Sequence, residues 1–221
     1  IKKNKIFKKK VNQDLNLVHN FLSKKNLNEF RVNLINSINN NKTLRSDYYK
    51  LAKKHLDAIV GNELVMQKRV NLSIQLPNDD SSLLPVHSDT WSGDSPYEVV
   101  LWVPLVDCYK TKSMYILPPN HLKKFHKHFK SKKLSSTELY KKIKSKVKFL
   151  NIKFGEILIF NQNLPHGNIV NKESESRWSL NCRFKNIFSP YGDKKIGEFF
   201  EPITLKPASK IAFNYKYPNE T

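Results

Sequence analysis

The spacing of apolar residues changes near residue 63, and this change constrains the fold more than any other feature of the chain. Before it, apolar residues such as Leu27, Phe30 and Leu34 recur at helical spacing. After it, apolar and polar residues alternate, as strands require. The expected strands lie at 69–76, 97–106, 113–117, 156–160, 167–170 and 177–188. Helices followed by many short strands are typical of a β-sandwich or jelly roll with helical support.

The pattern divides the chain into a helical segment and a β-rich segment with no Gly/Ser linker between them. Residues 12–60 predict an N-terminal helical support, which includes a helix at 46–59. Residues 63–205 predict the β core, and a Lys-rich stretch at 121–148 predicts an exposed helical insertion within it. No internal repeat is present, so we expect residues 1–221 to form a single domain.

The chain carries a formal net charge of +20, from 39 basic and 19 acidic residues. Such a charge attracts polyanions such as nucleic acid, anionic membranes or phosphorylated metabolites. Lys, Asn and Ile are abundant together, however, as expected from a coding sequence biased toward A and T. No zinc-finger spacing or RNP-like aromatic strand is present, so we do not expect nucleic acid as a partner.

The composition and the two cysteines indicate a packed protein in a reducing compartment. Hydrophobic residues make up 39% of the chain and aromatic residues 11%, as in globular proteins. No apolar run approaches the roughly 18 residues of a membrane span, and the basic N-terminal stretch lacks a signal peptide's apolar core. Cys108 and Cys182 read as buried thiols, although one disulfide is also compatible with the sequence. We therefore expect a cytoplasmic protein.

Three residues that suit a metal ion occur in the order His87, Asp89, His166. His87 and Asp89 are two residues apart, so on a strand both side chains point the same way. Two imidazoles and one carboxylate can occupy one face of a metal and leave its other positions open, which suits non-heme Fe(II) oxygenases. Each residue also has a structural explanation, because the pair lies among loop-forming residues and the second His lies between Pro and Gly.

The strand expected at 177–188 carries a polar row whose direction the sequence leaves open. Such a row either faces water or lines a pocket inside a barrel. Arg177, eleven residues past His166, can bind a carboxylate bidentately, and Ser179 can add a hydrogen bond. The apolar face holds Trp178, Leu180, Cys182 and Phe184, the polar face holds Arg177, Ser179, Asn181 and Arg183, and a second polar row at 69–75 includes Asn71 and Gln75.

Taken in order, these residues resemble the Fe(II)/2-oxoglutarate dioxygenase superfamily. Residues 101–107 and 114–121 resemble its phytanoyl-CoA dioxygenase branch, with a similar strand, turn and Pro-x-x-His ending. Residues 88–94, 103–118 and 164–202 are more similar still to a bacterial subgroup encoded in carbohydrate-biosynthesis clusters. The resemblance covers roughly residues 64–203 and departs at one turn, where Lys112-Ser113 replaces the Asn-Gly common in the broader branch.

The resemblance implies a double-stranded β-helix, a jelly-roll or cupin-like fold of β-strands with N-terminal supporting helices. It implies that His87, Asp89 and His166 hold Fe(II), and that Arg177 and Ser179 bind the far carboxylate of 2-oxoglutarate, with Gln75 as a further candidate. Together with O2, this cosubstrate would oxidise a C–H bond of a small molecule and yield succinate and CO2. An Asp at position 89 favours hydroxylation, because related halogenases leave that ligand position open for halide.

For the substrate, the subgroup resemblance implies a carbohydrate or a nucleotide-linked sugar, and the charge favours an anionic one. Trp91 could stack on a sugar ring or simply pack under its loop, Arg183 could bind a substrate anion, and Asn71 and Asn168 are further candidate contacts. Three alternatives stay open: an acyl or lipid substrate, a catalytically silent jelly roll that binds a metabolite, and nucleic-acid binding through residues 121–148. The sequence gives no indication of the oligomeric state.

Overall fold

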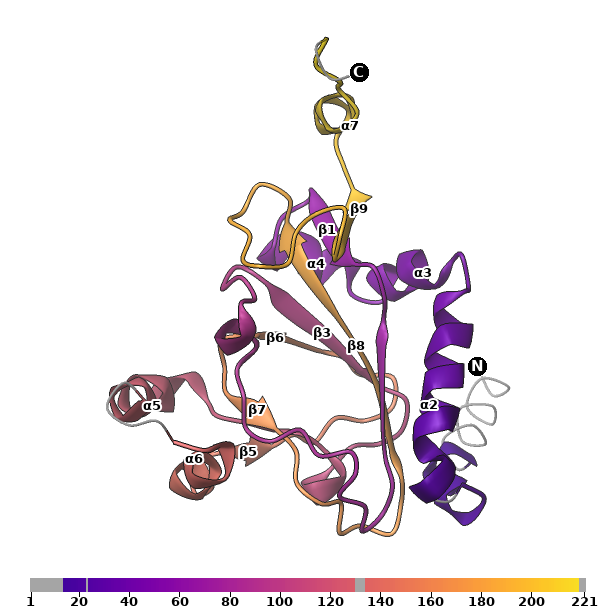
Figure 1. Cartoon of the computed structure of the whole chain (residues 1–221), viewed down its shortest axis with the longest axis vertical. Helices are drawn as coiled ribbons and strands as arrows, with labels where there is room; N and C mark the ends of the chain where they lie inside the picture. Colours follow the sequence, from indigo (N-terminus) through magenta and orange to yellow (C-terminus); the bar gives the residue numbers. More distant parts are fainter. Residues whose placement is uncertain (1–13, 23, 130–133, 219–221) are drawn as a thin grey trace.

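The computed structural model describes residues 14–22, 24–129 and 134–218 (Figure 1). A 3-10 turn η1 (Val18–Asn20) and helix α2 (Lys24–Asn39) come first. They are followed by α3 (Leu44–Lys50) and α4 (Lys53–Ile59). The single helix expected at 46–59 is therefore two short helices, which begin two residues earlier and break at residues 51 and 52. None of the helices in the described ranges is long and apolar enough to cross a membrane.

Two antiparallel sheets follow the helices. In the large sheet β3 (Val99–Pro104) pairs with one side of β8 (Arg177–Asn186), and β1 (Leu64–Gln67) and β2 (Asn71–Gln75) share the other side. The expected strand at 167–170 is reduced to a two-residue strand, because the chain leaves the ladder after Gly167. The large sheet consists of β1 (Leu64–Gln67), β2 (Asn71–Gln75), β3 (Val99–Pro104), β6 (Leu158–Asn161), β8 (Arg177–Asn186) and β9 (Phe200–Thr204), and the small sheet of β4 (Tyr115–Ile116), β5 (Lys148–Phe149) and β7 (His166–Gly167).

The Lys-rich stretch forms two helices between β4 and β5, on the opposite side of the molecule from α2 (Figure 1). They are α5 (Leu122–Phe129) and α6 (Ser136–Ile143). Ser135 caps α6 by accepting from the Glu138 amide, and Glu138 accepts from the Ser135 amide in return. Three further 3-10 turns, η2 (Asp89–Ser92), η3 (Lys110–Lys112) and η4 (Pro119–His121), and a C-terminal helix α7 (Pro207–Phe213) complete the described elements.

The packing of strand β8 shows which way its polar row faces. The apolar face is covered by the N-terminal helices: Phe30 of α2 meets Trp178 edge-on with 6.1 Å between ring centroids, and the Trp178 indole donates to the Leu15 carbonyl. Tyr49 of α3 lies against Phe184. Because strand side chains alternate, the opposite row points away from these helices, toward the small sheet. This polar row therefore lies inside the protein and does not face water.

Both cysteines are free and buried, which confirms the prediction of two buried thiols. Burial raises the pKa of Cys108 to about 12, and burial likewise raises that of Cys182 to about 12, so both stay protonated near neutral pH.

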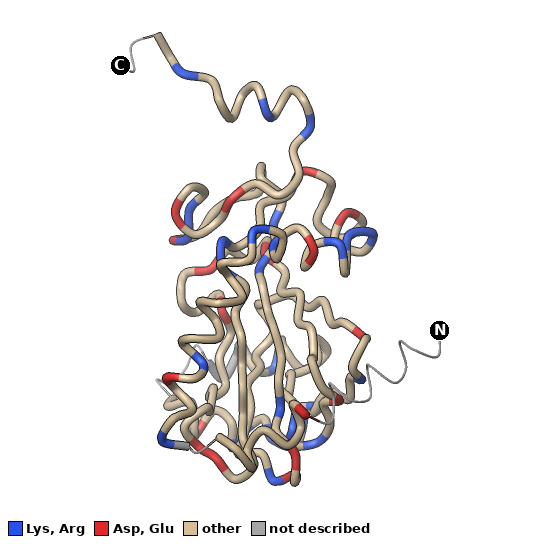
Figure 2. The backbone as a smooth tube through the Cα atoms, turned by 90° about the vertical axis from the view of Figure 1, so that its right-hand side faces the viewer, with Lys and Arg blue, Asp and Glu red and all other residues tan. Residues whose placement is uncertain are grey.

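Lys and Arg are distributed along the tube in Figure 2, with Asp and Glu among them. The charge therefore does not belong to one element.

The turn after Asp89 is fixed by a close approach of two glycines. Gly93 adopts a φ of +84°, and a Cβ on Gly192 would lie 2.1 Å from the Gly93 carbonyl oxygen. The Asp193 amide donates to that same carbonyl, and Lys194 pairs with Asp94 at 2.6 Å. The segment between β8 and β9 is thus packed directly against the loop that begins at Asp89.

We expect Gly192→Ala to destabilise the protein by about 3 kcal/mol, because the clash is with backbone that cannot turn away. Gly197→Ala is the matched control: its φ of +85° carries backbone strain, but nothing lies within 4 Å of the added Cβ. That control should cost only about 1 kcal/mol. Equal losses in urea unfolding would contradict the close approach.

Candidate metal centre

His87 and His166 are brought together by a pair of backbone hydrogen bonds. The His87 amide donates to the His166 carbonyl at 3.0 Å, and the His166 amide donates to the His87 carbonyl at 2.8 Å. This antiparallel bridge extends the small sheet by one position beyond β7. The two rings lie with centroids 4.3 Å apart. Segments almost 80 residues apart thus present both imidazoles to one point.

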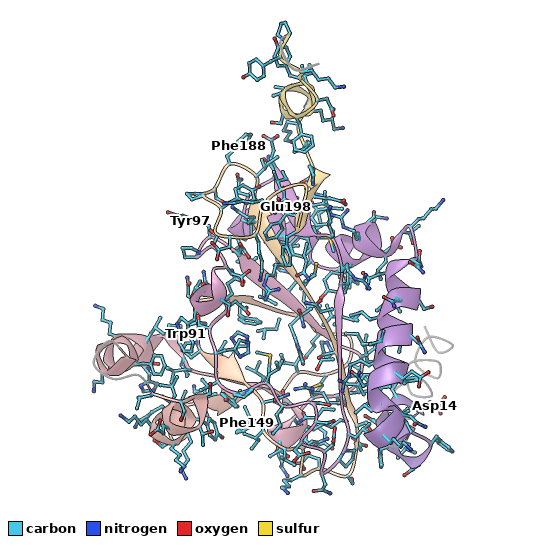
Figure 3. All side chains as sticks on the ribbon, viewed as in Figure 1. Asp14, Trp91, Tyr97, Phe149, Phe188 and Glu198 are labelled. Carbon is cyan, nitrogen blue, oxygen red and sulfur yellow. The ribbon has the colours of Figure 1, made fainter. Side chains whose placement is uncertain are left out.

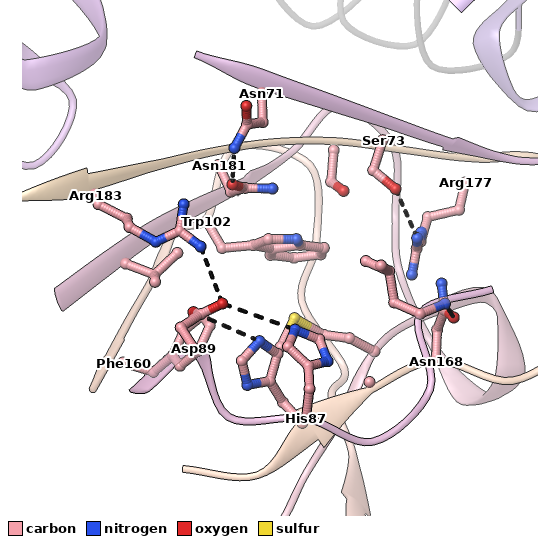
Figure 4. Close-up of a pocket in the computed structure, with 16 residues that line it drawn as sticks. Asn71, Ser73, His87, Asp89, Trp102, Phe160, Asn168, Arg177, Asn181 and Arg183 are labelled. Carbon is pink, nitrogen blue, oxygen red and sulfur yellow. Dashed lines mark hydrogen bonds and ion pairs between the residues drawn. The ribbon is translucent and has the colours of Figure 1, made fainter. Parts of the chain in front are cut away.

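Asp89 completes the cluster from the first residue of η2. Its amide donates to the Gln162 carbonyl at 3.2 Å, and the neighbouring Ser88 hydroxyl donates to the same oxygen. The carboxylate lies 3.8 Å from His87 Nε2 and 4.0 Å from His166 Nε2 (Figure 4). One ligand atom from each of the three residues lies within 4.8 Å of the others. This spacing allows all three to bind a single ion.

Each imidazole is hydrogen-bonded through Nδ1, which leaves its Nε2 free to bind a metal. Nδ1 of His87 lies 2.8 Å from the Pro85 carbonyl, and Nδ1 of His166 lies 2.8 Å from the Leu164 carbonyl. A carbonyl only accepts, so each Nδ1 carries the proton, and in the neutral ring Nε2 keeps its lone pair. Burial, and next the neighbouring His87, lower the pKa of His166 to about 4. His166 is therefore neutral near pH 7, as a metal ligand must be.

A cavity of about 320 Å³ opens beside the three residues. Two arginines of β8 reach it, Arg177 at one end and Arg183 at the other, with the His–Asp–His cluster between them (Figure 4). The apolar part of its wall is made by Leu84, Val100, Trp102, Met114 and Phe160, and the polar part by Asn71, Ser73, Asn168, Ser179 and Asn181. A small molecule placed here would contact both the ligand cluster and a cation.

Arg177 is buried without a negative partner in the described part of the chain. It is 3% exposed, and among the described residues its side chain donates one hydrogen bond, from Nη2 to the Ser73 hydroxyl at 2.9 Å. Its Nε has no acceptor, and the Ser179 hydroxyl in the same wall also has no partner. Burial lowers the pKa of the guanidinium from its ordinary value, yet an arginine remains charged near neutral pH. A buried cation beside unused donors fits an anionic ligand.

Arg183, unlike Arg177, has a negatively charged partner and donates hydrogen bonds from all three of its guanidinium nitrogens. Its Nη2 donates to Asp89 Oδ1 at 2.9 Å, its Nε donates to Gln162 Oε1, and its Nη1 donates to Gln67 Oε1. Asp94 lies 3.7 Å from the Nε. The guanidinium is therefore engaged with the candidate metal ligand itself.

The other residues expected at the site are placed less directly. Trp91 is not in the cavity wall: it points toward α5 and stacks on Phe125, with 6.0 Å between centroids and 13° between planes (Figure 3). Gln75 is fully buried opposite Arg177 but outside the wall, and its amide donates to the Ile169 carbonyl. Asn168 lines the cavity, yet its side chain holds the backbone of residues 82 and 84.

The polar rows supply Asn71 and Asn181, which are hydrogen-bonded to each other across β2 and β8 at 3.0 Å. Sequence reasoning missed Trp102, Phe160 and Met114 as cavity residues. Strand β3 is buried on both faces, so its unbroken apolar run carries no signal for which side chains face the cavity.

The chain matches no protein-family model and no curated protein. Solved structures share its fold at low identity. The nickel complex of the non-heme monooxygenase ThoJ has a TM-score of 0.53 at 15% identity, covering 80% of this chain and 72% of that one. The apo form of ThoJ has a TM-score of 0.54 at 14% identity, covering 80% and 73%. The non-heme α-ketoglutarate-dependent carbocyclase SnoK from nogalamycin biosynthesis has a TM-score of 0.50 at 16% identity, covering 74% and 72%. These likenesses establish the fold and no more.

Proposed function

We propose that the chain is an Fe(II)/2-oxoglutarate-dependent oxygenase that acts on a small molecule. The observation that carries this proposal is one cavity that holds both a His–Asp–His cluster and a buried arginine without a negative partner. The structures with the same fold include non-heme enzymes, one of them dependent on α-ketoglutarate. The two antiparallel sheets, with the His87–His166 bridge at the free edge of β7 in the small sheet, also support a double-stranded β-helix.

Different residues along the cavity would bind the metal and the cosubstrate. His87, Asp89 and His166 would hold Fe(II), because neutral imidazoles and one carboxylate suit that ion and leave positions open. Bound Fe(II), with 2-oxoglutarate and O2, supplies a two-electron oxidation of a C–H bond coupled to formation of succinate and CO2. Arg177 would bind the far carboxylate of the cosubstrate, with the hydroxyls of Ser73 and Ser179 beside it. The apolar wall around Phe160 limits the entry of water.

The test is succinate release from 2-oxoglutarate in the presence of Fe(II) and air, without substrate and then with candidate sugars and nucleotide sugars. We expect slow release alone and faster release with a true substrate. Absence of metal binding in anaerobic titration, together with absence of succinate, would leave a catalytically silent binding protein as the better description.

For the localisation of the protein, we still propose the cytoplasm.

For the substrate we propose a carbohydrate or nucleotide-linked sugar. The cavity offers an aromatic surface at Trp102 and the paired amides of Asn71 and Asn181, a mixture that suits sugar rings and hydroxyls. The alternative is an acyl chain, which the apolar side chains Leu84, Val100 and Met114 would favour.

Two tryptophan variants test where the substrate lies. We expect Trp102→Ala to lower substrate-stimulated succinate release by about tenfold, because the ring forms part of the cavity wall. Trp91→Ala should leave it within about twofold and lower thermal stability slightly, because that ring packs on α5. Stimulation in wild type by an acyl-CoA and by no sugar would replace the carbohydrate assignment with the lipid one.

A further inference from the structure

The Asp89 carboxylate is held by Arg183 through one of its two oxygens. Nη2 of Arg183 donates to Oδ1 at 2.9 Å, and Oδ1 lies 3.8 Å from His87 Nε2, whereas Oδ2 accepts no hydrogen bond from the described residues and lies 4.0 Å from His166 Nε2. The Asp89 side chain is 11% exposed. Water therefore competes little with the guanidinium, and the orientation of Asp89 is set chiefly by Arg183.

Arg183 is itself fixed on several sides. Its Nε donates to Gln162 Oε1 at 3.1 Å and its Nη1 to Gln67 Oε1 at 3.3 Å. Gln162 is fully buried, and its amide donates to Glu98 Oε2 at 2.9 Å and to the Ser95 carbonyl at 2.8 Å. The guanidinium also lies over the ring of Phe199 at 5.8 Å. A planar fork held at three nitrogens cannot follow the carboxylate if the carboxylate rotates.

We propose that Arg183 is a positioning residue that restricts Asp89 to one metal-binding oxygen, an inference that rests on the proposed function. With Oδ1 engaged by the guanidinium, Oδ2 is the oxygen left for the ion. A carboxylate that bound through both oxygens would occupy one more position of an octahedral ion. Two imidazoles and a single oxygen leave three positions, enough for a chelating cosubstrate and for O2. Arg183 thereby preserves the open face of the metal.

This role replaces the one that the sequence suggested for Arg183. A substrate anion would have to displace Asp89 from the guanidinium, and Asp94 at 3.7 Å already adds a second negative charge. Arg177, which has no such partner, is the cation of the cavity wall that remains available to an anion.

The test is Co(II) titration of wild type, Arg183→Ala and Arg183→Lys, followed by calorimetric titration of 2-oxoglutarate into each Co(II)-loaded protein. The visible absorption of Co(II) reports its coordination number. We expect Arg183→Ala to keep one Co(II) per chain, because removing a nearby cation relieves repulsion of the metal. Its Co(II) spectrum should change, and its affinity for 2-oxoglutarate should fall by about tenfold or more. Arg183→Lys, which keeps the charge but not the fork, should lie between.

Arg45→Ala is the matched control, since it removes an arginine that pairs with Glu201 at 2.7 Å outside the cavity wall. It should leave both titrations unchanged. An Arg183→Ala protein with the wild-type spectrum and cosubstrate affinity would overturn the proposal. Loss of Co(II) in both Arg183 variants would also overturn it, because the residue would then serve metal binding or folding generally. A wild-type protein that binds no Co(II) would instead refute the proposed function, and this inference with it.

Discussion

Arg177→Met is expected to make the ligand-free protein more stable while abolishing its response to 2-oxoglutarate. Arg177 is a buried guanidinium with no ion pair in the described ranges and with one nitrogen lacking an acceptor. A buried charge in that state costs free energy, so an apolar side chain of similar length should stabilise the fold by about 2 kcal/mol. For a chain of this size that corresponds to a rise in Tm of about 4–8 °C.

The same substitution removes the anchor for the cosubstrate. Loss of a charge-assisted contact that leaves the partner charge buried costs about 2–5 kcal/mol, so the Kd for 2-oxoglutarate should rise at least about 30-fold. Affinity for the metal should stay nearly unchanged, because Arg177 lies at the far end of the cavity from Arg183 and Asp89. Arg177→Lys should rescue binding only in part, since lysine lacks the planar fork.

Thermal unfolding with and without 2-oxoglutarate, on Co(II)-loaded protein, checks both effects at once. Wild type should be stabilised by the ligand in proportion to the logarithm of its concentration, and Arg177→Met should not. Ser179→Ala is the graded control: its hydroxyl has no partner, so its loss should weaken binding by only about 1 kcal/mol. A variant with a lower Tm and unchanged ligand response would remove Arg177 from the site.

Asp89→Asn is expected to reduce metal affinity by more than the roughly 100-fold that changes around a metal's ligands typically cause. The amide keeps nearly the same shape but removes the one negative ligand of the cluster. It also leaves Arg183 without its closest anion, so we expect a loss of stability of about 2 kcal/mol in addition. His166→Ala should lower metal affinity by a similar factor without disturbing that ion pair.

Anaerobic Fe(II) titration and urea unfolding measure the two effects separately. Asp79→Asn is the control, because Asp79 is also buried and accepts from Ser81 and Ser82 but lies outside the cavity wall. It should lose stability and keep full metal stoichiometry. Retention of one tightly bound Fe(II) in both Asp89→Asn and His166→Ala would place the metal elsewhere.

Local pattern was enough to predict the helical segment, the strands β2, β3, β6 and β8 of the large sheet, and the alternation of β8, whereas β1, β5 and β9 were not predicted. Each depends on spacing between near neighbours, and the side-chain directions of a strand follow from its geometry alone. The same rule placed Arg177, Ser179, Asn181 and Arg183 on one face, and all four line the cavity. Helix ends were less well predicted, because local spacing does not fix the residue at which a helix ends, as the break at residues 51 and 52 shows.

The sequence by itself therefore determined which side chains share a face and which residue types suit a metal. Only the tertiary structure decided which face is enclosed and which charge meets which. Trp91 and Trp102 are both strand- or turn-borne tryptophans near the ligand cluster, yet one packs on α5 and the other forms the cavity wall. Arg177 and Arg183 stand in the same row, yet Asp89 neutralises one and leaves the other unpaired. Such outcomes depend on contacts between segments far apart in the chain, which no local spacing encodes.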